Sequence, residues 1–283
     1  MSGLRWVPEL QVLYPFAMAM DYSGHVDSTY LDTAAQMLSA AKRRTYELMD
    51  LQVGHRVLDL GCGPASDTIA LADLVGETGQ VQGADFDPEM VEEANVRAKA
   101  AGLDERVLHR QADATALPFD DDFFDACRSE RVFQHLPDPV AGLGEMIRVT
   151  RPGGRIVVLD TDFGSLSIAS EVSELERRVA EHYRSMINSP FAGRMLYRSF
   201  KAAGLDDVSV EVIPVALDDL GVFSETFVLA RVLQAAEDAG ALTHDEVLHF
   251  RADLEQAAEI GGFFASVQQL LVTGRKPDVT ASA

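Results

Sequence analysis

The sequence predicts an α/β fold in which a doubly wound, mostly parallel sheet of seven strands carries helices on both faces. Short apolar runs alternate with segments of helical periodicity along most of the chain, a pattern typical of parallel strands joined by helices. The continuous apolar run at residues 156–159 indicates a strand that is buried on both faces. A chain of 283 residues, 47% of them hydrophobic, is long enough to bury a core of this size.

The first half of the chain holds five predicted strands and four helices. Thr33 stands where it can cap a helix that runs to about residue 50. Pro88 begins another helix, where its missing N–H costs nothing. The strands are predicted at residues 56–60, 81–85, 107–111, 124–129 and 155–160, and the other helices at 67–74, 88–101 and 139–149.

Beyond residue 164 the regular alternation of short apolar runs with helical segments is lost, which indicates a helical cap on the sheet. Helices are predicted at residues 170–187 and 191–203, and two more follow an alternating strand at Val208, Val210 and Val212. The last strand, at 264–274, is expected to pair antiparallel with that strand at the sheet edge. The expected organisation is a lid and helix at 1–50, a main domain at 51–276 with cap insertions at about 164–203 and 217–261, and a disordered tail at 277–283.

Composition and charge exclude several classes of partner. The formal net charge of −21 disfavours binding to nucleic acid or to an anionic membrane surface, and the short basic run at residues 42–44 is interpreted as a solvated helix face. No apolar run approaches the roughly 20 residues that span a bilayer, and no signal peptide is recognised. Two cysteines, Cys62 and Cys127, do not make a disulfide framework, so we expect a cytoplasmic protein. The acidic run at 120–122 indicates a solvated turn, and no metal site is predicted; a homo-oligomer is compatible with the sequence.

Glycines and acidic residues follow the predicted strands at the edge where an open parallel sheet binds its ligands. Gly61 and Gly63 let the backbone approach a ligand closely at the start of a helix. Asp85 ends the second strand, where a carboxylate can accept both hydroxyls of a ribose. Asp113 can accept from an adenine amine, and Asp59 can balance an ammonium group.

A glycine turn with a ribose acid is also found in proteins that bind nicotinamide dinucleotides. Ser66 stands where that fingerprint requires a third glycine. The carboxylates of Asp59 and Asp113 would not stabilise the negative charge of a pyrophosphate. These two carboxylates suit a ligand that carries a sulfonium and an ammonium. A nicotinamide-dependent oxidoreductase is therefore the second interpretation, and a non-catalytic cofactor-binding protein is the third.

Five segments in order resemble the motifs of class I S-adenosylmethionine-dependent methyltransferases, in particular the ubiquinone/menaquinone-type group of small-molecule enzymes. Ala65 stands where that family often has a further glycine. The resemblance implies a Rossmann-like methyltransferase fold, S-adenosylmethionine as cofactor, and O-, N- or C-methylation of a small-molecule acceptor such as a natural product or a quinone-like metabolite. The segments lie at residues 57–64, 83–90, 111–119, 124–139 and 151–155.

The resemblance also assigns roles to individual residues. Those at the ends of the first and fourth strands are implied to face the methionine portion, and the others the ribose and adenine. The first set is Asp59, Gly61, Cys62, Gly63, Ser129 and Glu130; the second is Asp85, Phe86, Met90, Asp113 and Ala114.

Residues for the acceptor are expected after strands four and five. His135 is the candidate base, and Asp162, which follows a strand that neighbours strand four in the sheet of the similar family, is expected to orient it. The aromatic N-terminus is predicted to fold over the site as a lid, with Tyr14, Tyr22 and Tyr30 contacting the acceptor. The cap segments are expected to determine which acceptor binds.

Overall fold

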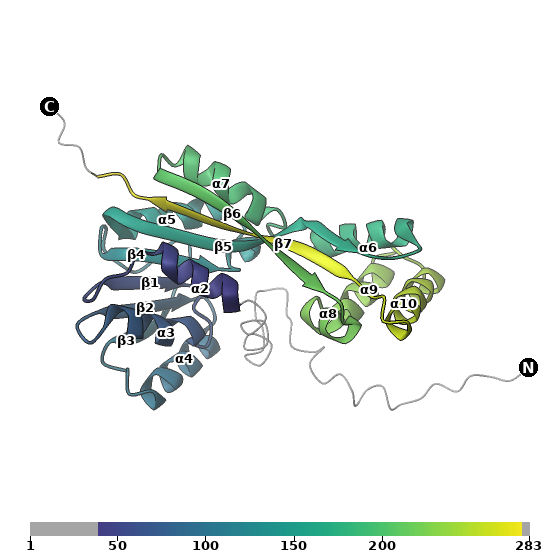
Figure 1. Ribbon diagram of the computed structural model, residues 1–283, viewed down its shortest axis with the longest axis horizontal. Coiled ribbons are helices and arrows are strands. Elements are labelled where there is room, and N and C mark those ends of the chain that lie inside the picture. The colour runs from purple at the N-terminus through teal and green to yellow at the C-terminus, as the bar shows by residue number, and fades with distance from the viewer. Residues whose placement is uncertain (1–38, 279–283) are drawn as a thin grey trace, which may run out of the picture.

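The structure is a computed structural model that describes residues 39–278, and they form the expected seven-stranded sheet (Figure 1). The strand order is β3-β2-β1-β4-β5-β7-β6. Strands β1 to β5 are parallel, and β7 runs antiparallel to both β5 and β6, as predicted. The strands are β1 (Arg56–Leu60), β2 (Gln80–Asp85), β3 (Val107–Gln111), β4 (Phe124–Glu130), β5 (Thr150–Ile168), β6 (Asp206–Leu217) and β7 (Ala265–Arg275).

Helices cover both faces of this sheet, which confirms the doubly wound arrangement. One face is covered by α2 (Ser39–Leu48), α3 (Ser66–Val75) and α4 (Pro88–Ala100), and the other by α5 (Pro139–Val149) and α7 (Ala192–Ala202). Leu71 of α3 packs in a buried cluster with Val57 of β1, and Met146 of α5 packs with Leu58 on the opposite face. Successive strand residues therefore fill two separate cores, as expected for a sheet buried on both sides.

Helix starts follow local chemistry that is visible in the sequence. Asp87 precedes Pro88, and its carboxylate accepts the backbone N–H of Glu89 at 2.8 Å, which caps α4. Thr243 and Glu246 form a capping box at the start of α10 (His244–Glu259), as the sequence predicts. These caps satisfy N–H groups that have no partner within their own helices.

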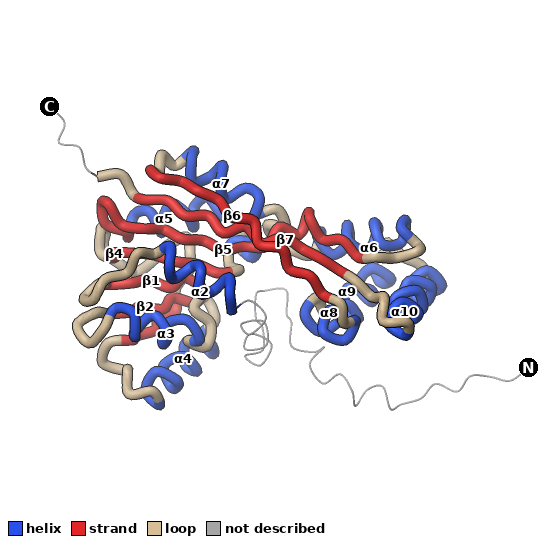
Figure 2. The backbone as a smooth tube through the Cα atoms, viewed as in Figure 1, coloured by secondary structure: helices blue, strands red, loops and turns tan. Residues whose placement is uncertain are grey.

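The long strands β5, β6 and β7 extend beyond the main sheet, so that β5 and β6 end, and β7 begins, among the helices of the cap (Figures 1 and 2). The cap consists of α6 (Ser173–Ser185), α8 (Leu220–Thr226), α9 (Leu229–Asp238) and α10. Phe163, Val179, Phe223 and Phe250 belong to a buried cluster distinct from the two on the sheet. The cap thus has a core of its own, attached to the main sheet by three strands.

One helix lies elsewhere than the sequence predicts. The segment 191–203 was expected in the cap, but α7 packs on the main sheet, where Leu196 and Phe200 are buried with α5. Gly193 makes this approach feasible, because a Cβ there would lie 2.8 Å from the Asp160 carbonyl oxygen. Strand β5 is also longer than the predicted 155–160, since it continues into the cap.

Several expectations concern residues outside 39–278. They are the start of the first helix, the N-terminal lid with Tyr14, Tyr22 and Tyr30, and most of the predicted tail. Among the helices of residues 39–278, none is both long and apolar enough to cross a membrane.

Candidate active site

The glycine turn after β1 lies at the point where the strand order reverses between β1 and β4. Gly61 and Gly63 have φ angles of 72° and 51°, in the left-handed region that favours glycine. A Cβ on Gly61 would lie 2.0 Å from a methyl carbon of Val132, so this position has no room for a side chain. Ala65 keeps a left-handed conformation (φ 73°) at the start of α3, at a cost of roughly 1–2 kcal/mol.

Asp85 connects this turn to the end of β2. Its Oδ2 accepts the N–H of Gly63 at 2.8 Å, and its Oδ1 accepts the N–H of Asp87 at 3.0 Å. Burial raises the pKa of Asp85, and these two hydrogen bonds oppose the shift. Each oxygen keeps a second lone pair, so both can still accept a ribose hydroxyl. Phe86, 61% exposed, stands beside it, and Met90 is half-buried.

Asp113 lies in an exposed turn after β3. Its Oδ1 accepts the backbone N–H and the hydroxyl of Thr115, both at 2.8 Å, and these bonds lower the pKa of Asp113. Ala114 is buried beside it. The carboxylate is therefore ionised and held in one orientation.

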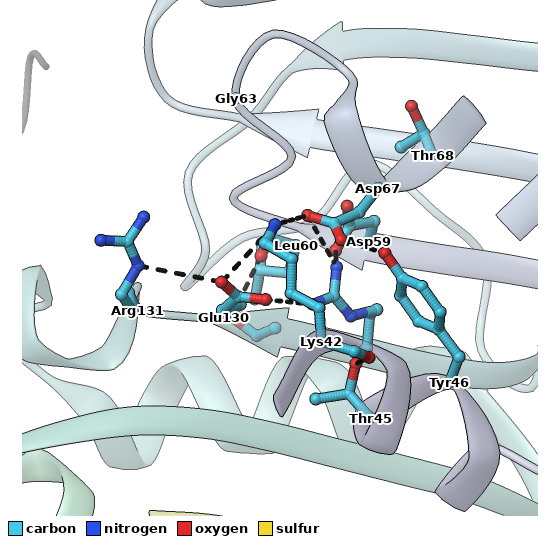
Figure 3. A network of polar contacts seen from close by, with 12 residues as sticks. Lys42, Thr45, Tyr46, Asp59, Leu60, Gly63, Asp67, Thr68, Glu130 and Arg131 are labelled. Atoms are coloured by element: carbon cyan, nitrogen blue, oxygen red, sulfur yellow. Dashed lines mark hydrogen bonds and ion pairs between the residues drawn. The ribbon is translucent and has the colours of Figure 1, made fainter. Parts of the chain in front are cut away.

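A network of buried charges lies beneath the glycine turn (Figure 3). Arg128 of β4, 1% exposed, is its centre, and we call the set the Arg128 network. Its guanidinium lies 3.1 Å from Asp59, 3.2 Å from Asp67 and 2.7 Å from Glu130. The members are Lys42 and Tyr46 from α2, Asp59 from β1, Asp67 from α3, and Arg128 and Glu130 from β4.

Helix α2 closes the Arg128 network from one side. Lys42 lies 2.5 Å from Asp67 and 3.5 Å from Glu130, and the hydroxyl of Tyr46 hydrogen-bonds to Asp67. The Lys42 side chain is only 13% exposed, so the interpretation of residues 42–44 as a solvated face is wrong for this residue. Burial, and then the charge of Asp67, raises the pKa of Tyr46.

Asp59, at the end of β1, is the member of the network that lies nearest in sequence to the glycine turn. Its Oδ1 accepts from Arg128 at 3.1 Å, whereas its buried Oδ2 has no hydrogen-bond partner within residues 39–278. Burial raises the pKa of Asp59 to about 7, and the charge of Arg128 opposes this shift. A buried acceptor without a donor is costly, so Oδ2 is suited to a ligand that brings an N–H group.

The other residues predicted at the methionine end use their side chains for contacts within the protein. The hydroxyl of Ser129 donates to the Leu60 carbonyl at 3.0 Å inside the sheet, and Glu130 belongs to the Arg128 network. The Sγ of Cys62 packs 2.7 Å from where a Cβ on Gly83 would stand. Any ligand contact from Ser129 and Cys62 therefore comes from their backbone.

The expected pairing of His135 with Asp162 is wrong. Both carboxylate oxygens of Asp162 are 2.8 Å from Nε of Arg194, and Oδ1 also accepts the N–H of Gly164 at 3.1 Å. Arg194 comes from α7, the helix whose position the sequence did not reveal. Asp162 is thus occupied by a cation and does not orient His135.

His135 lies in the short 3-10 helix η3 (Phe133–His135) after β4. Its Nε2 is 3.0 Å from the Gln134 side-chain nitrogen, and the side chain of Asn188 donates to its carbonyl at 2.8 Å. Although the residue as a whole is exposed, desolvation of the ring, and then the positive charge of Arg131, lowers the pKa of His135 to about 4. The imidazole is therefore neutral near pH 7, and the lowered pKa also makes it a weaker base than an unperturbed histidine.

Asp160, which the sequence analysis did not single out, holds the turn before His135. Its oxygens accept the N–H groups of Phe133 at 2.7 Å and Thr161 at 2.9 Å. Burial raises the pKa of Asp160 to about 7, and these hydrogen bonds oppose that shift. Asp160, in the middle of β5, thus fixes η3 and the end of β4 against that strand.

Comparison with known families identifies this arrangement. A family model described as a methyltransferase domain matches residues 51–204, which include the glycine turn, Asp85, Asp113 and η3. The chain belongs to the class I S-adenosylmethionine-dependent methyltransferases. S-adenosylmethionine is its cofactor, and the oxidoreductase interpretation is set aside.

Relatives of this methyltransferase include proteins of several descriptions. An uncharacterised 37.1 kDa protein of transposon TN4556 from Streptomyces fradiae is 34% identical over 250 residues, covering 87% of this chain and 70% of that protein. Demethylmenaquinone methyltransferase of Bacillus subtilis is 31% identical over 183 residues, 64% of this chain and 74% of that one. The methyltransferase GfsG of Streptomyces halstedii is 36% identical over 145 residues, and the alignment covers 51% of each chain.

Solved structures share the fold at low identity. YcgJ from Bacillus subtilis superposes with a TM-score of 0.59 at 20% identity, covering 86% of this chain and 99% of YcgJ. The [4+2]-cyclase SpnF gives 0.56 at 22%, over 86% and 83% of the two chains. Geranyl diphosphate C-methyltransferase of Streptomyces coelicolor A3(2), with S-adenosyl-L-homocysteine, gives 0.54 at 18%, over 84% and 76%. These likenesses establish the fold alone.

The residues of this chain fit the methyltransferase cofactor. Val132 packs where a Cβ of Gly61 would stand, which fixes the glycine turn at the end of β1. The unpartnered Oδ2 of Asp59 is a suitable acceptor for the cofactor's ammonium group.

Proposed function

We propose that the protein transfers the methyl group of S-adenosylmethionine to a small-molecule acceptor that binds between the carboxyl ends of β4 and β5 and the helical cap. The observation that carries this proposal is the buried, unpartnered Oδ2 of Asp59 beside the glycine turn. This oxygen can accept a hydrogen bond from the ammonium group of an amino-acid-bearing sulfonium cofactor, a group that a nicotinamide dinucleotide lacks.

The residues proposed to bind the methyl donor are those whose side chains or backbone groups can still form hydrogen bonds with a ligand. Asp59 and the backbone of Gly61, Cys62 and Gly63 receive the methionine portion, and the carboxylate of Asp85 receives the ribose hydroxyls. Phe86 and Met90 pack on the sugar and the base, and Asp113 and the backbone of Ala114 accept from the adenine edge. When bound, S-adenosylmethionine supplies a methyl group on a positively charged sulfur. The protein aligns that methyl group with the acceptor and excludes water.

His135 is the proposed base, and it acts without Asp162. The neutral imidazole can take a proton from a hydroxyl, a phenol or an acidic carbon, so the proposal covers O-, N- and C-methylation. Asn188, from the segment between α6 and α7, hydrogen-bonds to the backbone of His135. The base is thereby attached to the segment that leads from the cap to α7.

The cap supports an apolar acceptor. Phe163 and Tyr183 meet edge to face at 5.4 Å where β5 enters the cap, and Phe227 packs on both. The quinone ring of demethylmenaquinone and the geranyl chain of geranyl diphosphate, named for a relative and a structural neighbour, are groups that such a surface can contact. Contacts from Tyr14, Tyr22 and Tyr30, a cytoplasmic location and a homo-oligomer stay predictions.

Calorimetry with S-adenosylhomocysteine tests the donor site. We expect binding by the wild type, and an affinity about tenfold or more lower for Asp85→Ala, because two ribose hydrogen bonds are lost. Failure of the wild type to bind would refute the proposal, and binding of NADH instead would restore the oxidoreductase interpretation.

Turnover tests the base. Purified protein is screened with apolar quinols, phenols and prenyl diphosphates for release of S-adenosylhomocysteine. With an acceptor that turns over, His135→Ala should lower kcat by about 100-fold or more while cofactor affinity is retained. His249→Ala, in an exposed position on α10, is the matched control. Near-normal turnover by His135→Ala would remove His135 from the mechanism.

A further inference from the structure

Arg131 is the residue that directly follows β4, and its backbone is held in an uncommon conformation. Its φ angle is 55°, in the left-handed region that side chains other than glycine rarely adopt. Its N–H donates to the carbonyl of Leu159 at 2.8 Å, which fixes the chain where β4 ends beside β5. Such strain is maintained at functional sites when it directs a side chain to a required place.

The guanidinium of Arg131 has few partners among the residues that the structure describes. The side chain is 17% exposed, and its buried Nε has no hydrogen-bond partner within residues 39–278. Glu130 is the one carboxylate in ion-pair range there, at 3.8 Å, and it is already bound by Arg128 at 2.7 Å and approached by Lys42 at 3.5 Å. Three cations therefore share Glu130, and Arg131 is the most distant of them.

Arg131 stands at the same edge of the sheet as the glycine turn. Strands β1 and β4 are paired with Leu60 beside Ser129, so both chains leave the sheet at one level. The next residue, Val132, packs against Gly61 so closely that a Cβ there would lie 2.0 Å from its methyl carbon. In Figure 3 the guanidinium of Arg131 lies beyond Glu130, directed away from the Arg128 network.

The amino-acid portion of the methyl donor carries an ammonium and a carboxylate. Asp59 offers a buried, unpartnered oxygen for the first, and Arg131 offers a partly buried cation with an unpartnered Nε–H for the second. We propose that Arg131 binds the α-carboxylate of the donor's methionine portion, an inference that rests on the donor site proposed above. A guanidinium matches a carboxylate with two parallel hydrogen bonds, which fixes the orientation of the methionine portion.

Charge balance favours the donor over an anionic acceptor as the source of this carboxylate. A partly buried cation with a distant counter-ion is stabilised by a fixed anion, and every donor molecule brings one. Binding it would leave Glu130 to Arg128 and Lys42. Each of the donor's two charged groups would then face a side chain of opposite charge.

The test compares ligands that differ only in the carboxylate. Calorimetry uses S-adenosylhomocysteine, its decarboxylated analogue 5′-deoxy-5′-(3-aminopropylthio)adenosine, and 5′-methylthioadenosine, which lacks the whole amino acid. Arg131→Met should weaken S-adenosylhomocysteine by about 10- to 100-fold, and change the other two by less than about twofold. Arg131→Lys should lose less, because it keeps the charge. Arg177→Met, at an exposed arginine on α6, is the matched control.

Each result separates the inference from the function on which it rests. Equal weakening of all three ligands by Arg131→Met would show a structural role and overturn the inference. Unchanged S-adenosylhomocysteine affinity with lost turnover would also overturn it and would assign Arg131 to the acceptor. A wild type that binds none of the three ligands would instead refute the proposed function.

Discussion

Replacing Arg128 with methionine should strongly destabilise the fold. Arg128 is buried against Asp59, Asp67 and Glu130 at 3.1, 3.2 and 2.7 Å. Without it, three buried carboxylates would face Lys42 alone within the Arg128 network. Removing one partner from a buried ion pair costs about 3–5 kcal/mol, and we expect a loss of that size in the free energy of unfolding near neutral pH.

The loss should depend on pH in a defined direction. Burial raises the pKa of Asp59 from 3.8 to about 7, and Arg128 opposes that shift, so Arg128→Met raises the pKa further. A carboxyl group with a raised pKa stabilises the fold fully below its unfolded pKa, and this contribution is lost as the pH rises through the folded pKa. The deficit of Arg128→Met relative to wild type should therefore be smaller near pH 5, where only Asp67 and Glu130 still need Arg128, than near pH 8.

Urea denaturation at several pH values measures both quantities. Arg177→Met controls for loss of an exposed arginine and should leave the free energy of unfolding within about 0.5 kcal/mol of wild type. In an Asp59→Asn background, Arg128→Met should cost about 0.5–3 kcal/mol less, because one carboxylate has been neutralised. A deficit below about 1 kcal/mol at pH 8, or one that does not shrink as the pH falls, would refute the charge argument.

Three further substitutions test other parts of the structure. Gly61→Ala forces a methyl group against Val132 in a left-handed backbone, so it should lower Tm and weaken S-adenosylhomocysteine by about tenfold or more; native affinity would contradict the close approach. Asp160→Asn leaves the N–H of Phe133 or Thr161 facing an amide donor, and urea denaturation should show a loss of about 1–3 kcal/mol. Phe223→Ala opens a cavity in the cap core and should cost about 3–5 kcal/mol in the unfolding of the cap, while S-adenosylhomocysteine affinity stays native; a parallel loss of affinity would show that the two cores are not independent.

The sequence alone predicts most of the sheet and the glycine turn, because their signals are local. The apolar run at 156–159 needs no partner to be recognised as a buried strand, and Pro88 and Thr243 mark helix starts within a few residues. The antiparallel pairing of β6 with β7 also follows from local alternation combined with position at the end of the chain.

What the sequence does not reveal depends on which elements meet in space. An amphipathic pattern shows that α7 buries one face, but not whether that face lies on the cap or on the sheet. The position of α7 then decides that Arg194, and not His135, is the partner of Asp162. Arg128 did leave a signal, since an arginine within the apolar strand 124–130 requires buried counter-charges, but its partners lie on β1, α3 and β4 itself.

The two ends of the molecule are stabilised by different forces, and this separation bears on how acceptors are chosen. The donor site is stabilised by the buried charges of the Arg128 network, whose geometry tolerates little change. The cap is stabilised by apolar packing, which tolerates changes of shape if its volume is preserved. The two meet at the segment between α6 and α7, where Ser189 donates to the Gln134 and Leu136 carbonyls around His135. Substitutions in the cap core can therefore alter the acceptor and its approach to His135 while the affinity for the methyl donor is preserved.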